Sequence, residues 1–285
     1  MASLPDNDIG WPTVKPPLKW AGGKRWLVPY LRALWRGYTR RRLVEPFCGG
    51  VAIALGLNPR RALLNDANPH LINFYRHLQR GLVVKIPMRN DGDLYYRHRA
   101  EFNRTIATPR GRGSRKAAAL FYFLNRTGFN GLCRFNRKGA FNVPFGRYGK
   151  ITYIHDFRSY AEPLSRWIFT DGDFESLDMS PKDFIYADPP YDVQFRDYSS
   201  DGFDWDAQER LAAWLARHPG PVVASNQATD RIVKLYRGLG FDVDFLDGPR
   251  WISRTGDRTP ALEILATRNL DRSRPQGGNR HPTPI

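Results

Sequence analysis

The sequence predicts an α/β protein with a mostly parallel, doubly wound sheet and a mainly helical domain inserted into it. Strand-like apolar runs alternate with helix-like patterns, an order typical of parallel sheets whose helices cover both faces. The alternation stops at residues 81–160, where basic helical stretches precede a loop rich in glycine and asparagine. The 285 residues suffice for one large domain or two smaller ones with a real core.

The expected sheet has seven strands, each a short strand-like segment. In chain order they span residues 42–47, 62–66, 167–170, 184–187, 221–225, 241–245 and 261–267. Helical patterns lie between them at residues 23–34, 69–79, 206–217 and 229–239. Two further helical patterns, at residues 94–106 and 114–124, belong to the insertion.

This pattern divides the chain into domains. Residues 1–16 are polar and proline-bearing, so we expect a flexible N-terminal arm. Residues 17–80 and 161–267 form the expected sheet domain, and residues 81–160 form the inserted domain. Residues 268–285 are rich in arginine, proline and glycine, which predicts a disordered tail.

Positive charge is concentrated in the insertion. Residues 97–150 contain thirteen Lys or Arg residues and a single acid, Glu101, and so carry +12 of the net charge of +16. Clustered positive charge is the footprint of a polyanion binder. Aromatic residues interleaved with it favour nucleic acid over a membrane surface. The alternative is a solvated basic face.

Composition also excludes several classes of protein. No apolar run is long enough to span a membrane, and residues 1–13 lack the basic start and apolar centre of a signal peptide. Two cysteines, Cys48 and Cys133, form no disulfide framework and favour a reducing, cytoplasmic compartment. No Cys/His cluster has metal-ligand spacing, so we expect no metal.

The most informative motif is Asp-Pro-Pro-Tyr, directly after the apolar run at residues 184–187. Open α/β sheets bind ligands at the carboxyl ends of their strands. A carboxylate and a proline-fixed carbonyl can accept hydrogen bonds from an exocyclic amine, and the tyrosine can stack on the attached ring. The alternative is an ordinary turn, where Asp and Pro are common. We expect the catalytic residues to be Asp188, Pro189, Pro190 and Tyr191.

Three features surround the expected ligand site. Glu-Pro-Phe-Cys-Gly-Gly follows the first strand at residues 45–50, where glycines let the backbone approach a ligand. Asp66 ends the second strand seventeen residues after Gly49, and an acid at this place can accept hydrogen bonds from a ribose. The alternative for Asp66 is a helix N-cap. Lys-Trp-Ala-Gly-Gly-Lys at residues 19–24 exposes backbone between a Trp and a Lys, which indicates a ligand wall.

The insertion carries a loop with features of base recognition. It reads Asn-Arg-Thr-Gly-Phe-Asn-Gly-Leu-Cys-Arg at residues 125–134, followed by Phe-Asn-Val-Pro-Phe-Gly at residues 141–146. Arginine reads guanine with two hydrogen bonds in the major groove, and apolar side chains contact the thymine methyl group. Phe129 can wedge into a base stack. The alternative is a glycine-rich turn with a buried aromatic ring.

Taken in order, these five motifs resemble the Dam-type (D12 class, group alpha) DNA adenine-N6 methyltransferases over residues 17–267. The resemblance implies a class I, Rossmann-like catalytic domain that uses S-adenosyl-L-methionine. It also implies a DNA-recognition insertion and double-stranded DNA as the partner. The expected reaction is N6 methylation of a flipped adenine in GATC or a close relative, in a bacterial or phage setting where the protein is nucleoid-associated.

The resemblance also implies roles for individual residues. Leu132 and Arg134 match side chains that read the target bases, Phe129 matches an intercalating aromatic, and Lys19 matches a lysine on the first guanine. Cofactor contacts are implied at Trp20, Lys24, Phe47, Gly49, Asp66, Asp173, Phe174 and Asp188. DNA contacts are implied at Lys19, Arg126, Phe129, Asn130, Leu132, Arg134 and Pro144.

Two positions depart from the family's pattern, and other functions share some features. Val51 stands where many members carry a third small residue, and residues 254–258 replace a stretch containing Asn-Gly. An N4-cytosine methyltransferase, an RNA adenine methyltransferase and an inactive DNA-binding module are the alternatives. Carbon-5 cytosine chemistry needs a thiolate beside the flipped base, and neither cysteine lies in such a motif. The sequence leaves open whether a restriction enzyme accompanies the protein.

Overall fold

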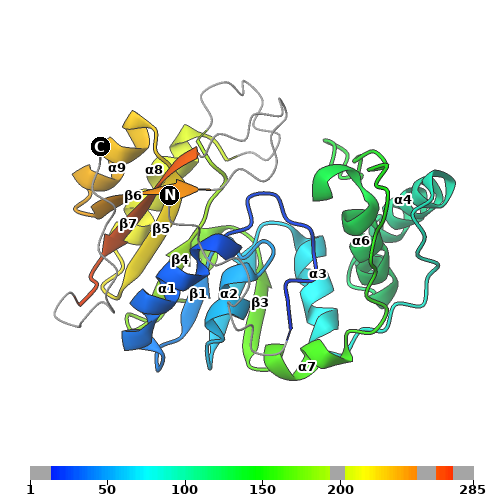
Figure 1. Cartoon of the computed structure of the whole chain (residues 1–285), viewed down its shortest axis with the longest axis horizontal. Coiled ribbons are helices and arrows are strands. Elements are labelled where there is room, and N and C mark those ends of the chain that lie inside the picture. Colours follow the sequence, from blue (N-terminus) through cyan, green and yellow to red (C-terminus); the bar gives the residue numbers. More distant parts are fainter. Residues whose placement is uncertain (1–13, 193–202, 249–260, 272–285) are drawn as a thin grey trace.

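The computed structural model describes residues 14–192, 203–248 and 261–271, centred on a seven-stranded sheet of order β3-β2-β1-β4-β5-β7-β6 (Figure 1). Strands β1 to β5 pair in parallel, and β7 is antiparallel to both β5 and β6. The predicted α/β class and all seven predicted strands are confirmed, with small shifts at their ends. The strands are β1 (Leu43–Glu45), β2 (Ala62–Asp66), β3 (Trp167–Asp171), β4 (Phe184–Ala187), β5 (Val222–Gln227), β6 (Asp242–Gly248) and β7 (Ala261–Arg268).

Two cores cover the two faces of the sheet, because successive strand residues point to opposite sides. Leu43 and Phe184 belong to one core, whereas their neighbours Val44 and Ile185 belong to the other. Burial on both faces explains why the central strands read as continuous apolar runs. The first core lies under α1 (Val28–Trp35), α2 (Ala52–Leu57) and α3 (Pro69–Leu78), and the second under α8 (Trp205–Ala216) and α9 (Asp230–Gly238).

The insertion leaves and rejoins the sheet domain at one place. Val84 N donates to the His155 carbonyl at 2.8 Å, and Phe157 N donates to the Leu82 carbonyl at 2.8 Å. The outgoing and returning chains therefore lie side by side, close to the predicted limits of the inserted domain. Between them lie α4 (Gly92–Ile106), α5 (Pro109–Arg112), α6 (Arg115–Thr127) and a hairpin closed by a bridge between Phe135 and Phe141.

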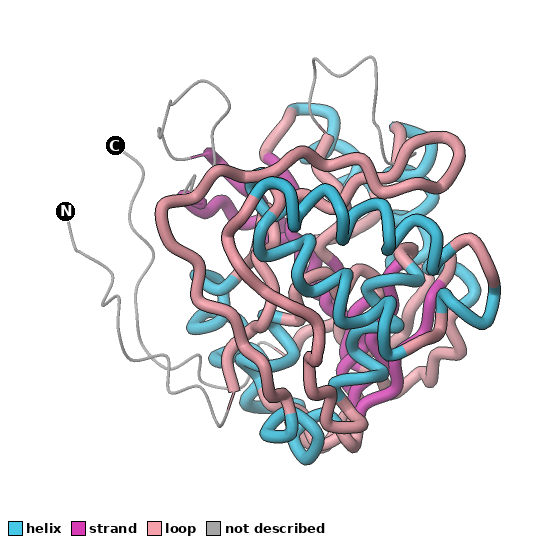
Figure 2. The backbone as a smooth tube through the Cα atoms, turned by 90° about the vertical axis from the view of Figure 1, so that its right-hand side faces the viewer, coloured by secondary structure: helices cyan, strands magenta, loops and turns pink. Residues whose placement is uncertain are grey.

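An apolar joint connects the insertion to the sheet domain. Phe74 of α3 stacks on Tyr122 of α6, with ring centroids 5.8 Å apart, and one continuous core contains both residues. Figure 2 views the molecule from this side, with the helices of the insertion in front of the sheet. Shared burial of this kind holds the insertion in a defined position beside α3.

Several helical segments differ from the prediction, among them the unpredicted α5. Residues 23–34 divide into a 3-10 helix, Arg25–Leu27, and α1, whose first turn contains Pro29 because proline needs no partner for a missing N–H there. The short helix α2 was not predicted, since every one of its residues is apolar and buried and so shows no helical period. The short helix α7 (Arg158–Leu164) was also missed.

Two predicted domain ends are wrong by several residues. Val14 is buried, and Tyr160 Oη donates to the Lys15 carbonyl at 2.7 Å, so the arm predicted over residues 1–16 packs on the domain at its end. The tail predicted from residue 268 is wrong for its first two residues, because β7 continues to Arg268 and Asn269 Nδ2 donates to the His218 carbonyl at 3.0 Å. Residues 1–13 and 272–285 lie outside the described residues.

Two sequence expectations concern absences. Within the described part of the chain, no helix is long and apolar enough to cross a membrane. The same residues contain no group of three or more His, Cys, Asp or Glu side chains that could hold a metal ion. The unusual stretch at residues 254–258 lies outside the described residues.

Candidate functional site

The predicted ligand loops meet at the point where the strand order reverses. From β1 the chain adds β2 and β3 on one side, and β4 and β5 lie on the other. The loops after β1 and β4 therefore face each other across a topological switch point, where open α/β sheets bind their ligands. These loops contain residues 46–50 and 188–192.

The loop after β1 is built around its glycine pair. Gly49 has a φ of +43°, and a Cβ there would lie 2.5 Å from Trp20 Nε1. A Cβ on Gly50 would lie 2.9 Å from Trp20 Cβ. The Trp20 side chain therefore occupies the space that the missing side chains leave, and only glycine permits this contact. Val51 follows with a φ of +51°, a strained conformation for a β-branched residue, as the N-cap of α2.

Asp66 lies beside this loop at the end of β2. Its carboxylate accepts from Gly49 N at 3.1 Å and from Asn68 N at 3.0 Å. Burial raises the pKa of Asp66 to about 6, although these two backbone hydrogen bonds oppose the shift. The alternative reading of Asp66 as a helix cap is wrong, because Asn68 accepts from His70 N and Leu71 N and caps α3.

Asp188 lies at the end of β4 and is held from two sides. Ser225 Oγ donates to Asp188 Oδ1 at 2.8 Å, and Lys24 Nζ lies 3.6 Å from the same oxygen. The Asp188 side chain is 21% exposed, so a ligand can reach it. Burial raises its pKa to about 6, and Lys24 and Ser225 limit the shift because both favour the charged form.

The rest of the tetrapeptide loop is also anchored. Gln208 Nε2 donates to the Pro190 carbonyl at 2.8 Å. Tyr191 Oη donates to Glu263 Oε2 at 2.6 Å and contacts Lys24 Nζ. Burial raises the pKa of Tyr191 far above its ordinary value, so its hydroxyl is neutral and remains a donor.

Three of these anchors were not predicted. Ser225 ends a predicted strand, and that place is a signal that sequence reasoning could have used. Gln208 lies on α8, and Glu263 lies on the antiparallel strand β7. Nothing in the local sequence relates Glu263 to the tetrapeptide, because only the strand order brings them together.

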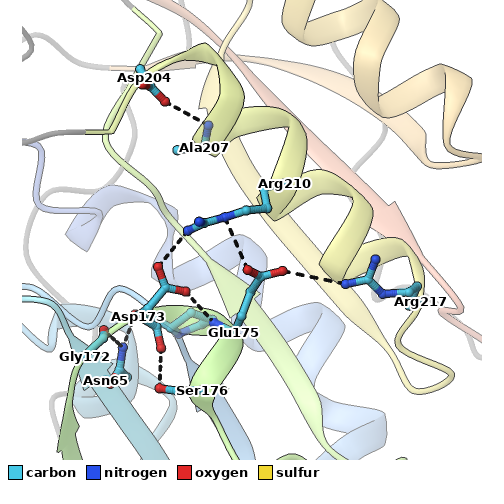
Figure 3. A network of polar contacts seen from close by, with 10 residues as sticks. Asn65, Gly172, Asp173, Glu175, Ser176, Asp204, Ala207, Arg210 and Arg217 are labelled. Atoms are coloured by element: carbon cyan, nitrogen blue, oxygen red, sulfur yellow. Dashed lines mark hydrogen bonds and ion pairs between the residues drawn. The ribbon is translucent and has the colours of Figure 1, made fainter.

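Asp173 and Phe174 have structural contacts of their own. Figure 3 shows the Asp173 carboxylate paired with Arg210 of α8, at 2.6 Å between Nη2 and Oδ2. Asp173 Oδ1 also accepts from Glu175 N at 2.9 Å. Phe174 is 3% exposed and packs on Phe47, with ring centroids 5.8 Å apart. Phe47 is the more open ring of this pair, and the adenine contacts implied for Asp173 and Phe174 stay predictions.

Lys19 lies against the loop of the insertion, far from it in sequence. Asn125 holds its backbone, since Lys19 N donates to Asn125 Oδ1 at 2.9 Å and Asn125 Nδ2 donates to the Lys19 carbonyl at 2.8 Å. The Lys19 ammonium lies 3.4 Å from the centroid of the Tyr148 ring, a close cation–π contact. The segment before α1 therefore joins the insertion to the glycine loop.

The predicted DNA contacts lie along residues 126–144. Phe129 is 47% exposed, an unusual position for a large apolar ring, and its N–H donates to the Pro144 carbonyl at 2.9 Å. Arg134 is exposed on the hairpin, and its Nε donates to Asn142 Oδ1 at 2.8 Å. This bond leaves both Arg134 Nη groups able to donate to a base. Leu132 is half-buried beside it.

Asn130 and Arg126 differ from these open side chains. Asn130 has a φ of +52°, which bends the loop between Phe129 and Leu132. Arg126 Nη2 donates to the Thr152 carbonyl at 3.2 Å, so part of its guanidinium is used within the insertion. Arg126 therefore also supports the loop.

Glu45 ends β1 behind the switch point. Its side chain is buried, and its Oε1 atom has no hydrogen-bond partner among the described residues. Burial raises the pKa of Glu45 well above its usual range, and the nearby charge of Asp188 adds to the effect. An unsatisfied buried oxygen at this place fits a site that receives a polar ligand.

Comparison with known proteins agrees with this geometry. A family profile described as D12 class N6 adenine-specific DNA methyltransferase matches residues 20–245. The retron Ec67 DNA adenine methylase of Escherichia coli is 36% identical over 264 residues, which cover 87% of this chain and 90% of that protein. The DNA adenine methylase of Vibrio cholerae is 36% identical over 270 residues, with 87% and 94% covered.

A phage protein is similar too. The DNA N-6-adenine-methyltransferase of Escherichia phage P1 is 35% identical over 268 residues, which cover 87% of this chain and 34% of the phage protein. The region that the family profile matches, residues 20–245, contains both switch-point loops and the insertion. The chain therefore belongs to the D12 class of N6 adenine-specific DNA methyltransferases.

Proposed function

We propose that this adenine-specific DNA methyltransferase transfers a methyl group from S-adenosyl-L-methionine to a flipped adenine within GATC or a close relative in duplex DNA. The observation that carries the proposal is the placement of Asp188. Its carboxylate lies at the switch point, partly exposed, and is held by Ser225 next to the glycine loop. Residues 17–80 and 161–267 serve as the catalytic domain, and residues 81–160 recognise DNA.

The residues present fit the methyl donor. Asp66 supplies a carboxylate for ribose hydroxyls, and the Trp20 indole, which packs against the glycine pair, supplies an apolar surface beside it. Glu45 Oε1 is buried and has no hydrogen-bond partner among the described residues, so it is able to bind a polar group of the ligand. Phe47 offers a half-buried ring on which the adenine of the cofactor can pack. When bound, the sulfonium of the cofactor supplies an electrophilic methyl group.

The tetrapeptide activates the amine. The N6 lone pair of adenine is delocalised into the ring, so the nitrogen is a poor nucleophile. Asp188 and the Pro189 carbonyl accept hydrogen bonds from the two N–H groups of the amine. These hydrogen bonds favour a tetrahedral nitrogen whose lone pair points at the methyl group. As the nitrogen–carbon bond forms and the carbon–sulfur bond breaks, the same acceptors stabilise the positive charge that develops on nitrogen, which then loses one N–H proton to solvent. Alignment of the reacting atoms contributes the rest.

The insertion presents the duplex to this site. Its basic residues neutralise phosphates, and Phe129 inserts into the base stack that the target adenine leaves. Extrusion of the base costs a few kcal/mol, and stacking on the Tyr191 ring offsets part of it. The two hydrogen bonds between the Lys19 backbone and the Asn125 side chain fix the position of the recognition loop relative to the glycine loop.

The target sequence depends on few side chains. Arg134 forks onto guanine O6 and N7, a contact worth roughly 1–3 kcal/mol of discrimination. Leu132 contacts an adjacent base, and Lys19 contacts the other guanine less sharply because an ammonium lacks the planar fork.

The test is methylation of random-sequence duplex DNA followed by mapping of N6-methyladenine. We expect GATC-like sites, and Arg134→Ala should relax selectivity at one guanine about tenfold to a hundredfold. Arg137→Ala is the matched control, since Arg137 is an exposed arginine at the turn of the same hairpin. This variant should weaken binding to all DNA sequences equally. Methyladenine found mainly outside GATC-like sites would refute the proposed target while leaving the enzyme class intact.

A further inference from the structure

We propose that Glu263 is a positioning residue for methyl transfer, which holds Lys24 and the Tyr191 hydroxyl so that Asp188 stays available to the target amine. The inference rests on the catalytic role proposed for the tetrapeptide and extends it to a strand that carries no recognised motif. Glu263 contacts neither the target amine nor the methyl donor. It acts through the two side chains that it binds.

The strand order explains how Glu263 reaches the site. Because β7 runs antiparallel to β5, its early residues lie at the carboxyl end of the parallel strands. Glu263 pairs in register with Gln227, two residues beyond Ser225 on β5. The side chain therefore extends over the same edge of the sheet as the tetrapeptide, although it comes from the other end of the sequence.

Both carboxylate oxygens of Glu263 are occupied. Oε2 accepts from Tyr191 Oη at 2.6 Å and lies 3.1 Å from Lys24 Nζ. Oε1 accepts from Lys24 Nζ at 3.2 Å. Glu263 and Lys24 are 7% and 4% exposed, so each is a buried charge that needs its partner.

The neighbouring strand leaves room for this carboxylate. Gly248 of β6 has no side chain, and a Cβ there would lie 2.6 Å from Glu263 Oε1 and 2.8 Å from its Cδ. Since the whole carboxyl group would be crowded, a larger residue at position 248 would displace Glu263. The space beside β6 is thus matched to the position that binds Lys24 and Tyr191.

Lys24 stands between two carboxylates. Its ammonium lies 3.1 Å from Glu263 Oε2 and 3.6 Å from Asp188 Oδ1, so Glu263 is the closer partner. If Glu263 lost its charge, the ammonium would turn to Asp188, because a buried cation seeks the remaining anion. Asp188 would then be engaged by Lys24 and would accept less from the amine. Tyr191 would retain only a neutral, weaker acceptor for the hydroxyl that orients its ring.

The test is the Glu263→Gln variant, which keeps the shape of the side chain and removes its charge. In single-turnover assays with duplex DNA we expect the methylation rate to fall about tenfold or more, which corresponds to the loss of one charge-assisted contact. Glu263→Asp keeps the charge and should restore part of the rate. Gly248→Ala should lower the rate in the same direction by displacing the carboxylate.

The pH profile separates positioning from a structural role. Several groups face Asp188: Lys24 before α1, Glu45 on β1, Tyr186 on β4, Ser225 on β5, Tyr191 in its own loop, and Glu263 on β7. Removing the Glu263 charge takes away a repelling anion and draws Lys24 to Asp188. Both effects favour ionised Asp188, so the acid limb should move to lower pH by about half a unit or more.

The outcomes are distinct. A slower Glu263→Gln variant with a lowered acid limb supports the inference. A rate within twofold of the wild type, or a slower rate with an unmoved acid limb, overturns it. If Glu263→Gln fails to fold, the Gly248→Ala variant decides by the same two readouts, and Glu263→Asp is the control that retains the charge. A wild-type protein that transfers no methyl group to adenine would instead refute the proposed function.

Discussion

Replacing Ser225 by alanine should move the pH dependence of methyl transfer in a direction set by one hydrogen bond. Ser225 is 1% exposed, and its Oγ donates to Asp188 Oδ1 at 2.8 Å. The same hydroxyl lies 2.9 Å from Tyr186 Oη, so the three groups form a chain that ends at the carboxylate. Alanine removes the last donor and leaves the strand intact.

The expected shift follows from the strength of that bond. A hydrogen bond to a charged group contributes about 1.5–3 kcal/mol. Because the Asp188 side chain is 21% exposed, water replaces part of the loss, and we take the lower value. One pKa unit corresponds to about 1.4 kcal/mol, so the pKa of Asp188 should rise by about one unit. In the native protein this pKa is about 6, and in Ser225→Ala it becomes about 7.

The sign is unambiguous, since the lost donor favours the ionised form that accepts the amine. Single-turnover rates measured from acid to alkaline pH should therefore show an acid limb about one unit higher than in the wild type. Tyr186→Phe is the control, because it removes a hydrogen bond to Ser225 and leaves the hydrogen bond from Ser225 to Asp188, so it should shift the limb less. An acid limb that stays in place, or moves down as expected for Glu263→Gln, would contradict the reasoning.

Four further outcomes test other parts of the structure. Asp188→Ala should lower turnover by about a hundredfold or more while gel-shift affinity for DNA survives; near-normal turnover by the folded variant would show that the chemistry lies elsewhere. Asp66→Asn should weaken cofactor binding by about 1.5–3 kcal/mol in calorimetry, because the ribose loses a charged acceptor, and an unchanged affinity would remove Asp66 from the site. DNA affinity should fall with salt, with a slope of about −0.9 per phosphate contact in a double logarithmic plot, whereas a flat plot would exclude a polyanion interface. Gly56→Ala should cost about 1–3 kcal/mol of stability by thermal denaturation, because its Cβ would lie 2.7 Å from Val28 at the α1–α2 contact, and an unchanged Tm would mean that the helices can separate freely.

Local sequence was sufficient for the parts of the protein that follow a period or a compact motif. The apolar runs predicted the central parallel strands because both faces of those strands are buried. The edge strand β6 is mostly exposed and was predicted from the mixed segment Phe-Asp-Val-Asp-Phe. Asp188 and Asp66 were placed correctly at strand ends, since the motif and the strand are adjacent in the chain. The short helix α2 was missed because it is buried on every side, so its sequence has no polar face and no helical period.

Contacts between distant segments were beyond the sequence. The tertiary packing places Phe174 between Phe47 and Trp214, and nothing in the local sequence indicates these two partners. Asn125 was one letter of a loop motif, and only the fold shows that it holds the backbone of Lys19. Such partners depend on where two elements meet in space, and the residue spacing within one element does not predict that contact.

By itself, the sequence determined the α/β class, the position of the insertion and the loops that carry Asp66 and Asp188. These features follow from the local spacing of apolar residues and from the backbone preferences of glycine and proline. The tertiary structure decided which groups set the properties of those carboxylates. Ser225, Lys24 and Glu263 reach Asp188 and Tyr191 from three different elements. Charge and hydrogen bonding act through distance in space, so the environment of a catalytic group becomes readable only when the strand order is known.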